Sequence, residues 1–94
     1  MHVGALAVDV RLPDCHSLKE KRAVVKTILQ GSTRRYGVSA AEVGHQDKWQ
    51  RALLGFSVVS GSPAHAQEVI DAVERFVWSF PEVEVIDASR QWLE

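Results

Sequence analysis

The sequence is poor in cysteine and proline and has no long hydrophobic run. Its single cysteine, Cys15, excludes a disulfide framework within the chain and is typical of a reduced cytosolic thiol, with a reactive or metal-bound thiol as the alternative. No stretch approaches the roughly 20 apolar residues of a membrane-spanning helix, and the first residues lack the pattern of a signal peptide. We therefore expect a cytoplasmic protein without a membrane partner.

Net charge is also small, because 11 lysines and arginines nearly balance 12 aspartates and glutamates. A net charge of −1 argues against binding through overall charge, so we expect no DNA partner, although a local basic patch is compatible with this composition. A chain of 94 residues, of which 46% are hydrophobic, is long enough to bury one core. We expect a single domain over residues 1–94 that needs no cofactor.

Hydrophobic periodicity predicts six elements of secondary structure. Alternation with a period of two predicts strands over residues 2–12, 38–44, 51–61 and 83–93. Apolar residues at helical spacing predict two helices, over residues 17–37 and 62–79. Ser17 and Glu20 would open the first helix as a capping box. Gly31 and Ser32 weaken this helix and leave its end open.

The order strand–helix–strand–strand–helix–strand is the split βαβ, or ferredoxin-like, pattern. We therefore predict an α+β sandwich in which two helices cover one face of a four-stranded antiparallel sheet with the spatial order 4-1-3-2. The bulky faces of the first and third strands would meet the helices. The open face would display the smaller side chains of the same strands, namely Ala5, Ala7, Asp9, Leu53, Gly55, Ser57 and Val59.

This open face has no aromatic side chain among those residues, whereas RNA-recognition sheets stack bases on aromatic rings. A small, flat and mildly apolar surface suits contact with another subunit better. We therefore expect a homo-oligomer, most simply a dimer, that forms through this face. The alternative is that the small residues merely tolerate water.

Four segments, "LPDCHSLKEKR", "VSAAEVGHQDKWQRALLG", "VVSGSPAH" and "FPEVEVIDA", resemble the YlxP-like family of small bacterial proteins of unknown function. The resemblance covers nearly the whole chain, and it implies a ferredoxin-like fold. Members of the family are commonly encoded beside genes for translation initiation and ribosome maturation, which implies a link to RNA or to a ribosome-linked partner by association. The resemblance supplies no catalytic residues. The chain departs from the family pattern at Gly31–Ser32.

The topology should bring residues 13–22, 44–51 and 79–82 to one end of the domain. The first helix offers free backbone amides and the positive end of its dipole there. A candidate anion- or RNA-binding edge then comprises Lys19, Lys21, Arg22, His45, Gln46, Trp49 and Arg51. The alternative is a solvated charged surface, balanced by Glu20 and Asp47. We expect Trp49 to close the end of the core rather than to stack on a base.

A histidine and a carboxylate two residues apart, His45 and Asp47, are candidates for a metal-ligand or acid–base pair. The ligand spacing of a zinc site is missing, and no serine or cysteine lies in a nucleophile motif. We therefore predict a non-catalytic binding module. The alternative is a small-ligand or metal-dependent enzyme that uses His45 and Asp47.

Overall fold

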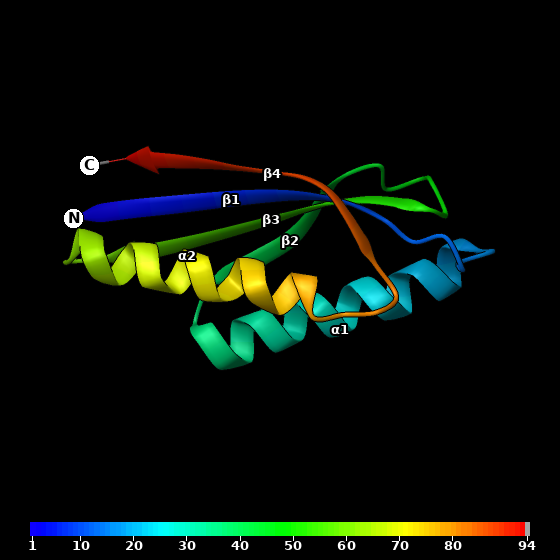
Figure 1. The fold of residues 1–94 in the computed structure, drawn as a ribbon, viewed down its shortest axis with the longest axis horizontal. Coiled ribbons are helices and arrows are strands. Elements are labelled where there is room, and N and C mark those ends of the chain that lie inside the picture. Colours follow the sequence, from blue (N-terminus) through cyan, green and yellow to red (C-terminus); the bar gives the residue numbers. More distant parts are fainter. Residues whose placement is uncertain (94) are drawn as a thin grey trace.

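Figure 1 shows a computed structural model that describes residues 1–93, with four strands in one layer and both helices on the same side of them. In chain order the elements are β1 (His2–Arg11), α1 (Leu18–Tyr36), β2 (Ser39–Gly44), β3 (Arg51–Ser60), α2 (Pro63–Trp78) and β4 (Glu84–Leu93). All strand pairs are antiparallel, in the order β2-β3-β1-β4. The predicted ferredoxin-like α+β fold, with the sheet order 4-1-3-2, is therefore confirmed. Within residues 1–93, neither helix has the length and apolar character needed to span a membrane.

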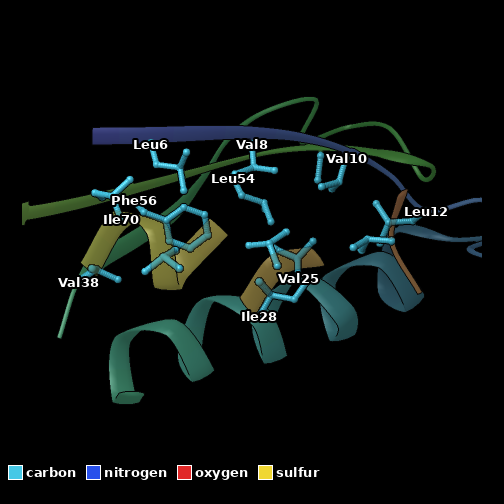
Figure 2. Packing of buried hydrophobic residues seen from close by; sticks show 14 of the residues in the cluster. Leu6, Val8, Val10, Leu12, Val25, Ile28, Val38, Leu54, Phe56 and Ile70 are labelled. Atoms are coloured by element: carbon cyan, nitrogen blue, oxygen red, sulfur yellow. The ribbon is translucent and has the colours of Figure 1, made fainter. Parts of the chain in front are cut away.

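The core lies between the sheet and the helices (Figure 2). Side chains alternate across a strand, so every second residue of β1 and β3 points toward the helices. There the strand residues meet Val25 and Ile28 of α1 and Ile70 of α2. Each large aliphatic side chain buried in this way stabilises the fold by about 1.5–3 kcal/mol. The buried strand residues are those that the alternation predicts: Leu6, Val8, Val10, Ala52, Leu54, Phe56 and Val58.

The N-terminal end of α1 differs in one bond from the predicted capping box. Ser17 is the N-cap, and its hydroxyl oxygen accepts a hydrogen bond from the amide of Glu20 at 3.1 Å. The carboxylate of Glu20, however, accepts from the amide of His16 at 2.9 Å instead of from Ser17. The carboxylate therefore satisfies the residue before the cap, and this bond fixes the turn that leads from β1 into the helix.

Helix α1 continues unbroken through Gly31 and Ser32 and ends at Tyr36. Both residues are explained by tertiary packing. A Cβ atom at position 31 would lie 2.7 Å from Cζ of Phe76 in α2, so a glycine allows this ring to approach the helix backbone. Ser32 is fully buried, and its hydroxyl donates to the carbonyl of Ile28 at 2.8 Å. The departure from the family pattern therefore lies at a close helix–helix contact.

The C-terminal end of α1 depends on Gly37, which adopts the left-handed conformation with φ of 68° and donates its amide to the carbonyl of Thr33. In this region a residue with a Cβ atom is strained by about 1–2 kcal/mol. A Cβ atom at position 37 would meet nothing within 4 Å. Backbone strain is therefore the cost to expect from a substitution here.

We predict that Gly37→Ala lowers the free energy of unfolding by about 1 kcal/mol, because of this strain. Gly61→Ala is the matched control, since a Cβ atom there also meets nothing within 4 Å and Gly61 does not have a positive φ. Urea denaturation at one protein concentration should place the control within about 0.5 kcal/mol of the unmodified protein. Equal losses in the two variants would contradict the strain argument.

Candidate functional site

The loop between β2 and β3, residues 45–50, lies at the same end of the molecule as the β1–α1 connection (Figure 1). The amide of Leu12 donates to the carbonyl of Gln50 at 3.0 Å. In return, Nε2 of Gln50 donates to the carbonyls of Pro13 and Cys15 at 3.3 and 3.2 Å. The β1–α1 connection and the β2–β3 loop, which the sequence predicts at one end of the domain, are therefore in direct contact.

Lys21 has a different role from the one that we expected. Its side chain is fully buried. Its ammonium donates to the carbonyls of His45, Gln46 and Arg51 at 2.9, 3.3 and 3.3 Å. It also lies 2.8 Å from Oε2 of Glu42. We call this arrangement the Lys21 cage. Since the cage provides more acceptors than the ammonium has N–H groups, Lys21 has no donor left for an external anion.

The sequence positions of the cage residues account for this burial. Lys21 begins the buried stripe of α1, which continues with Val25, Ile28 and Ser32 at spacings of three or four residues. Glu42 lies on the helix side of β2, because strand residues alternate and its neighbours Ala41 and Val43 are exposed. A buried ammonium loses its hydration, and here a carboxylate and three carbonyl groups replace the lost water.

Arg51, Asp9 and His45 form a second cluster at this end. Nη2 of Arg51 contacts both carboxylate oxygens of Asp9 at 3.0 and 2.8 Å. Nε2 of His45 lies 3.4 Å from Nη2 of Arg51 and 4.0 Å from Oδ1 of Asp9. The carboxylate nearest to His45 in residues 1–93 is therefore that of Asp9, whereas Asp47 is exposed in the turn. The alternative of a His45–Asp47 pair consequently gains no supporting contact.

The tip of the loop is exposed. Trp49 has 52% of its surface accessible and lies outside the core, so the expectation that its ring closes the core is wrong. Gln46 is also exposed, and its Nε2 donates to the carbonyl of Glu42 at 3.2 Å. The Lys21 cage and the Gln50 contacts hold the two ends of the loop, so its tip extends away from the core.

The structure favours neither metal binding nor a reactive thiol at this end. In residues 1–93, no three histidine, cysteine, aspartate or glutamate side chains lie close enough together to hold a metal ion. Cys15 is buried, and this burial raises the pKa of its thiol, to which the charges of Glu20 and Asp14 add. A thiol with a raised pKa forms less of the nucleophilic thiolate at neutral pH.

Unpaired positive charge lies instead along the outer side of α1. This helix holds six of the lysines and arginines, and its one acidic residue is Glu20. All of these cations except Lys21 are exposed, and none of the exposed ones forms an ion pair within residues 1–93. Helical spacing places four of them on one side. We call this surface the α1 basic ridge: Lys19, Arg22, Lys26 and Arg34.

The ridge includes two residues of the predicted edge, Lys19 and Arg22, and two that lie outside it, Lys26 and Arg34. Their recurrence every three, four and eight residues is the signal that identifies them in the sequence. This spacing can be recognised only if the first helix extends past Gly31. The sequence leaves the end of that helix open. The cations of the predicted edge therefore divide into two that are paired within the fold, Lys21 and Arg51, and the start of an exposed ridge.

Comparison with known proteins places the chain among proteins without an assigned activity. Residues 3–90 match a family model described as "Protein of unknown function (DUF503)". Over 90 residues the chain is 38% identical to the "Uncharacterized protein YlxP" of Bacillus subtilis (strain 168), and this match covers 96% of the chain and 98% of that protein. Neither description names a ligand or a reaction, so a function has to be argued from the surfaces described above.

We predict that Lys21→Met lowers the free energy of unfolding by about 3 kcal/mol, because it leaves the Glu42 carboxylate, two loop carbonyls and the carbonyl of Arg51 without their donor. Lys19→Met is the matched control, being the same change at an exposed position two residues earlier. Chemical denaturation should show a loss of less than about 0.5 kcal/mol for this control. If both variants were equally stable, the cage would not hold the loop.

Proposed function

The chain belongs to the YlxP-like family of proteins of unknown function (DUF503), and we propose that it is a non-catalytic binding module that self-associates as a dimer and binds RNA. The dimer would form through the open sheet face, and the α1 basic ridge would hold the RNA phosphates. One observation carries the proposal: both helices cover the same face of the sheet (Figure 1), and the unpaired cations lie on the exposed side of α1, away from its buried stripe and from the uncovered sheet face. Both contacts can therefore exist together.

The open face has an uncharged centre. Strand register aligns its residues in rows across the sheet, and the two middle rows contain no charge: Gln91, Ala5, Ser57 and Ser39 in one, and Ser89, Ala7, Gly55 and Ala41 in the other. At one end, Leu93, Val3 and Val59 form an aliphatic row. Val43 lies over Gly55, and Val43, Val59 and Leu93 are exposed. Exposed aliphatic side chains at both ends of an uncharged centre suit an interface.

A second copy of the chain suits the area of this face. With strands about 4.8 Å apart and about 3.3 Å per residue, four strands of this length present roughly 600 Å². Two copies would then bury about 1,200 Å², which is the lower limit for a stable specific interface. The available area thus supports a dimer that the open sheet face can form without further elements.

The other end of the face carries charges of both signs. Arg51 lies on β3, and the carboxylates of Asp9 and Asp87 lie on β1 and β4, where the two residues are register partners. A two-fold axis parallel to the strands stacks β3 of one copy over β1 of the other. The aliphatic rows of the two copies then meet each other at the other end, while the charges at this end stay paired within each copy, as Arg51 is with Asp9.

The α1 basic ridge supports the RNA part of the proposal. From Lys19 to Arg34 it extends over about 22 Å, at 1.5 Å per residue. Glu20, the one acidic residue of α1, binds the amide of His16 at the start of the helix. A row of free cations suits a phosphate backbone, whose binding they make salt-dependent. The gene neighbourhood that the family resemblance implies also favours RNA or a ribosome-linked partner.

We predict that Ala7→Arg converts the dimer to a monomer, because it places a charge in the uncharged centre of the open face. Ala64→Arg is the control, since this exposed alanine lies on α2, away from the sheet face. Light scattering coupled to size-exclusion chromatography measures the oligomer. The dimer proposal fails if folded Ala7→Arg keeps the oligomeric state of the unmodified protein.

We predict that the unmodified protein binds single-stranded RNA with an affinity that falls with salt, at about 0.7 in logarithmic slope for each phosphate neutralised. Lys19→Glu/Lys26→Glu should weaken this binding by at least about tenfold in fluorescence anisotropy. Arg75→Glu/Lys48→Glu reverses two exposed charges off the ridge and should cost less than about threefold. A folded ridge variant that binds as well as this control would remove the RNA proposal.

A further inference from the structure

A groove runs beside the α1 basic ridge, between the second half of α1 and the end of α2. It has a volume of about 280 Å³, and Gln30, Gly31, Arg34, Arg35, Phe76 and Phe80 line it. Phe80 belongs to the segment 79–82 that we expected at the start of α1. This residue instead lies beside the middle of the helix, where Thr27 and Gln30 line the same groove.

The α2 side of the groove is an aromatic wall. The rings of Phe76 and Phe80 meet edge to face, with centroids 5.0 Å apart and an interplanar angle of 89°. Phe76 is held in place by three neighbours: the edge of Tyr36, the backbone at Gly31 and the guanidinium of Arg35, whose carbon lies 5.0 Å from the ring centroid. Both phenylalanine rings are only partly buried. The wall is therefore positioned by packing and remains accessible to a ligand.

The α1 side of the groove is polar and positively charged. Gln30 and Arg34 are exposed, and Arg34 forms no ion pair within residues 1–93. None of the residues that line the groove is acidic. Arg34 belongs both to the groove and to the α1 basic ridge, so it connects an aromatic surface with a row of cations.

We propose that this groove holds one unpaired base of a single-stranded RNA whose phosphates follow the α1 basic ridge, an inference that rests on the RNA-binding function proposed above. The base stacks on Phe80, as bases stack on aromatic side chains in single-strand binding proteins. The amide of Gln30 offers a donor and an acceptor to the edge of the base. Arg34 contacts the adjoining phosphate.

The size of the groove is compatible with a single base. Pockets that enclose drug-sized ligands have volumes of about 300–1,000 Å³. At about 280 Å³, the groove accommodates a single base and leaves the rest of the strand outside, on the ridge. The open sheet face offers no aromatic ring on its four strands within residues 1–93. In this protein the base contact therefore belongs to the helical side of the fold.

The test compares two labelled strands of ten nucleotides, one with normal bases and one abasic, by fluorescence anisotropy. Both strands carry the same phosphates, so only the normal strand benefits from stacking. We expect the unmodified protein to bind the normal strand about tenfold more tightly. Phe80→Leu should remove this preference and leave the affinity for the abasic strand unchanged. Phe80→Tyr, which keeps a ring, should retain the preference.

Trp78→Leu is the matched control, because it removes an exposed ring from α2 outside the groove. It should leave the preference for the normal strand intact. Gln30→Ala, at an exposed position where folding is not at risk, should reduce the preference about threefold. Circular dichroism establishes whether each variant is folded. If Phe80→Leu does not fold, Gln30→Ala tests the groove assignment in its place.

The outcomes separate this inference from the function on which it rests. Equal affinity of the unmodified protein for the two strands overturns the groove assignment, and so does a folded Phe80→Leu that behaves like Trp78→Leu. In either case, salt-dependent binding that the ridge variant loses would still support RNA binding by the ridge. If neither strand binds, both proposals fail. If an acidic peptide of ten glutamates displaces both strands equally, the ridge binds polyanions in general. The groove then does not recognise a base, and the inference fails.

Discussion

The buried ammonium of Lys21 is the interaction on which this end of the protein depends. It joins α1 to three carbonyls of the β2–β3 segment and, through Glu42, to β2 itself. The two segments that carry the most specific family resemblance, "SLKEKR" and "AEVGHQD", are thus the two halves of one structural unit. Their chemistry is largely internal.

Pairing within the fold determines which cations remain free to bind a ligand. Lys21 is neutralised by Glu42, and Arg51 is paired with Asp9. The unpaired cations of α1 therefore form the surface that suits a polyanion, and they face away from the sheet. We propose that the open sheet face, with its uncharged centre, binds a second copy of the chain. A dimer built in this way presents two basic ridges on its outer sides, which would increase avidity for a long strand.

The sequence predicts local features of this protein well and distant contacts poorly. Period-two alternation identifies the buried faces of β1 and β3, because burial in a strand follows from its geometry. The burial of Lys21 could not be predicted, since its partners lie more than 20 residues away in the chain. Gly31 is explained by Phe76, which is even more distant in the sequence. The prediction that the Trp49 ring closes the core is wrong. A large apolar ring usually favours the core, but the contacts that fix both ends of its loop leave this ring outside.

The central claim is that α1, and not the loop between β2 and β3, is the surface that binds RNA. Amide chemical shifts of the isotope-labelled protein, followed by nuclear magnetic resonance during titration with single-stranded RNA, test it most directly. The account predicts that the amides around Lys26, Gln30 and Arg34 shift, while those of residues 45–50 and of the central strands stay unchanged. Shifts confined to residues 45–50, with none along α1, would contradict it.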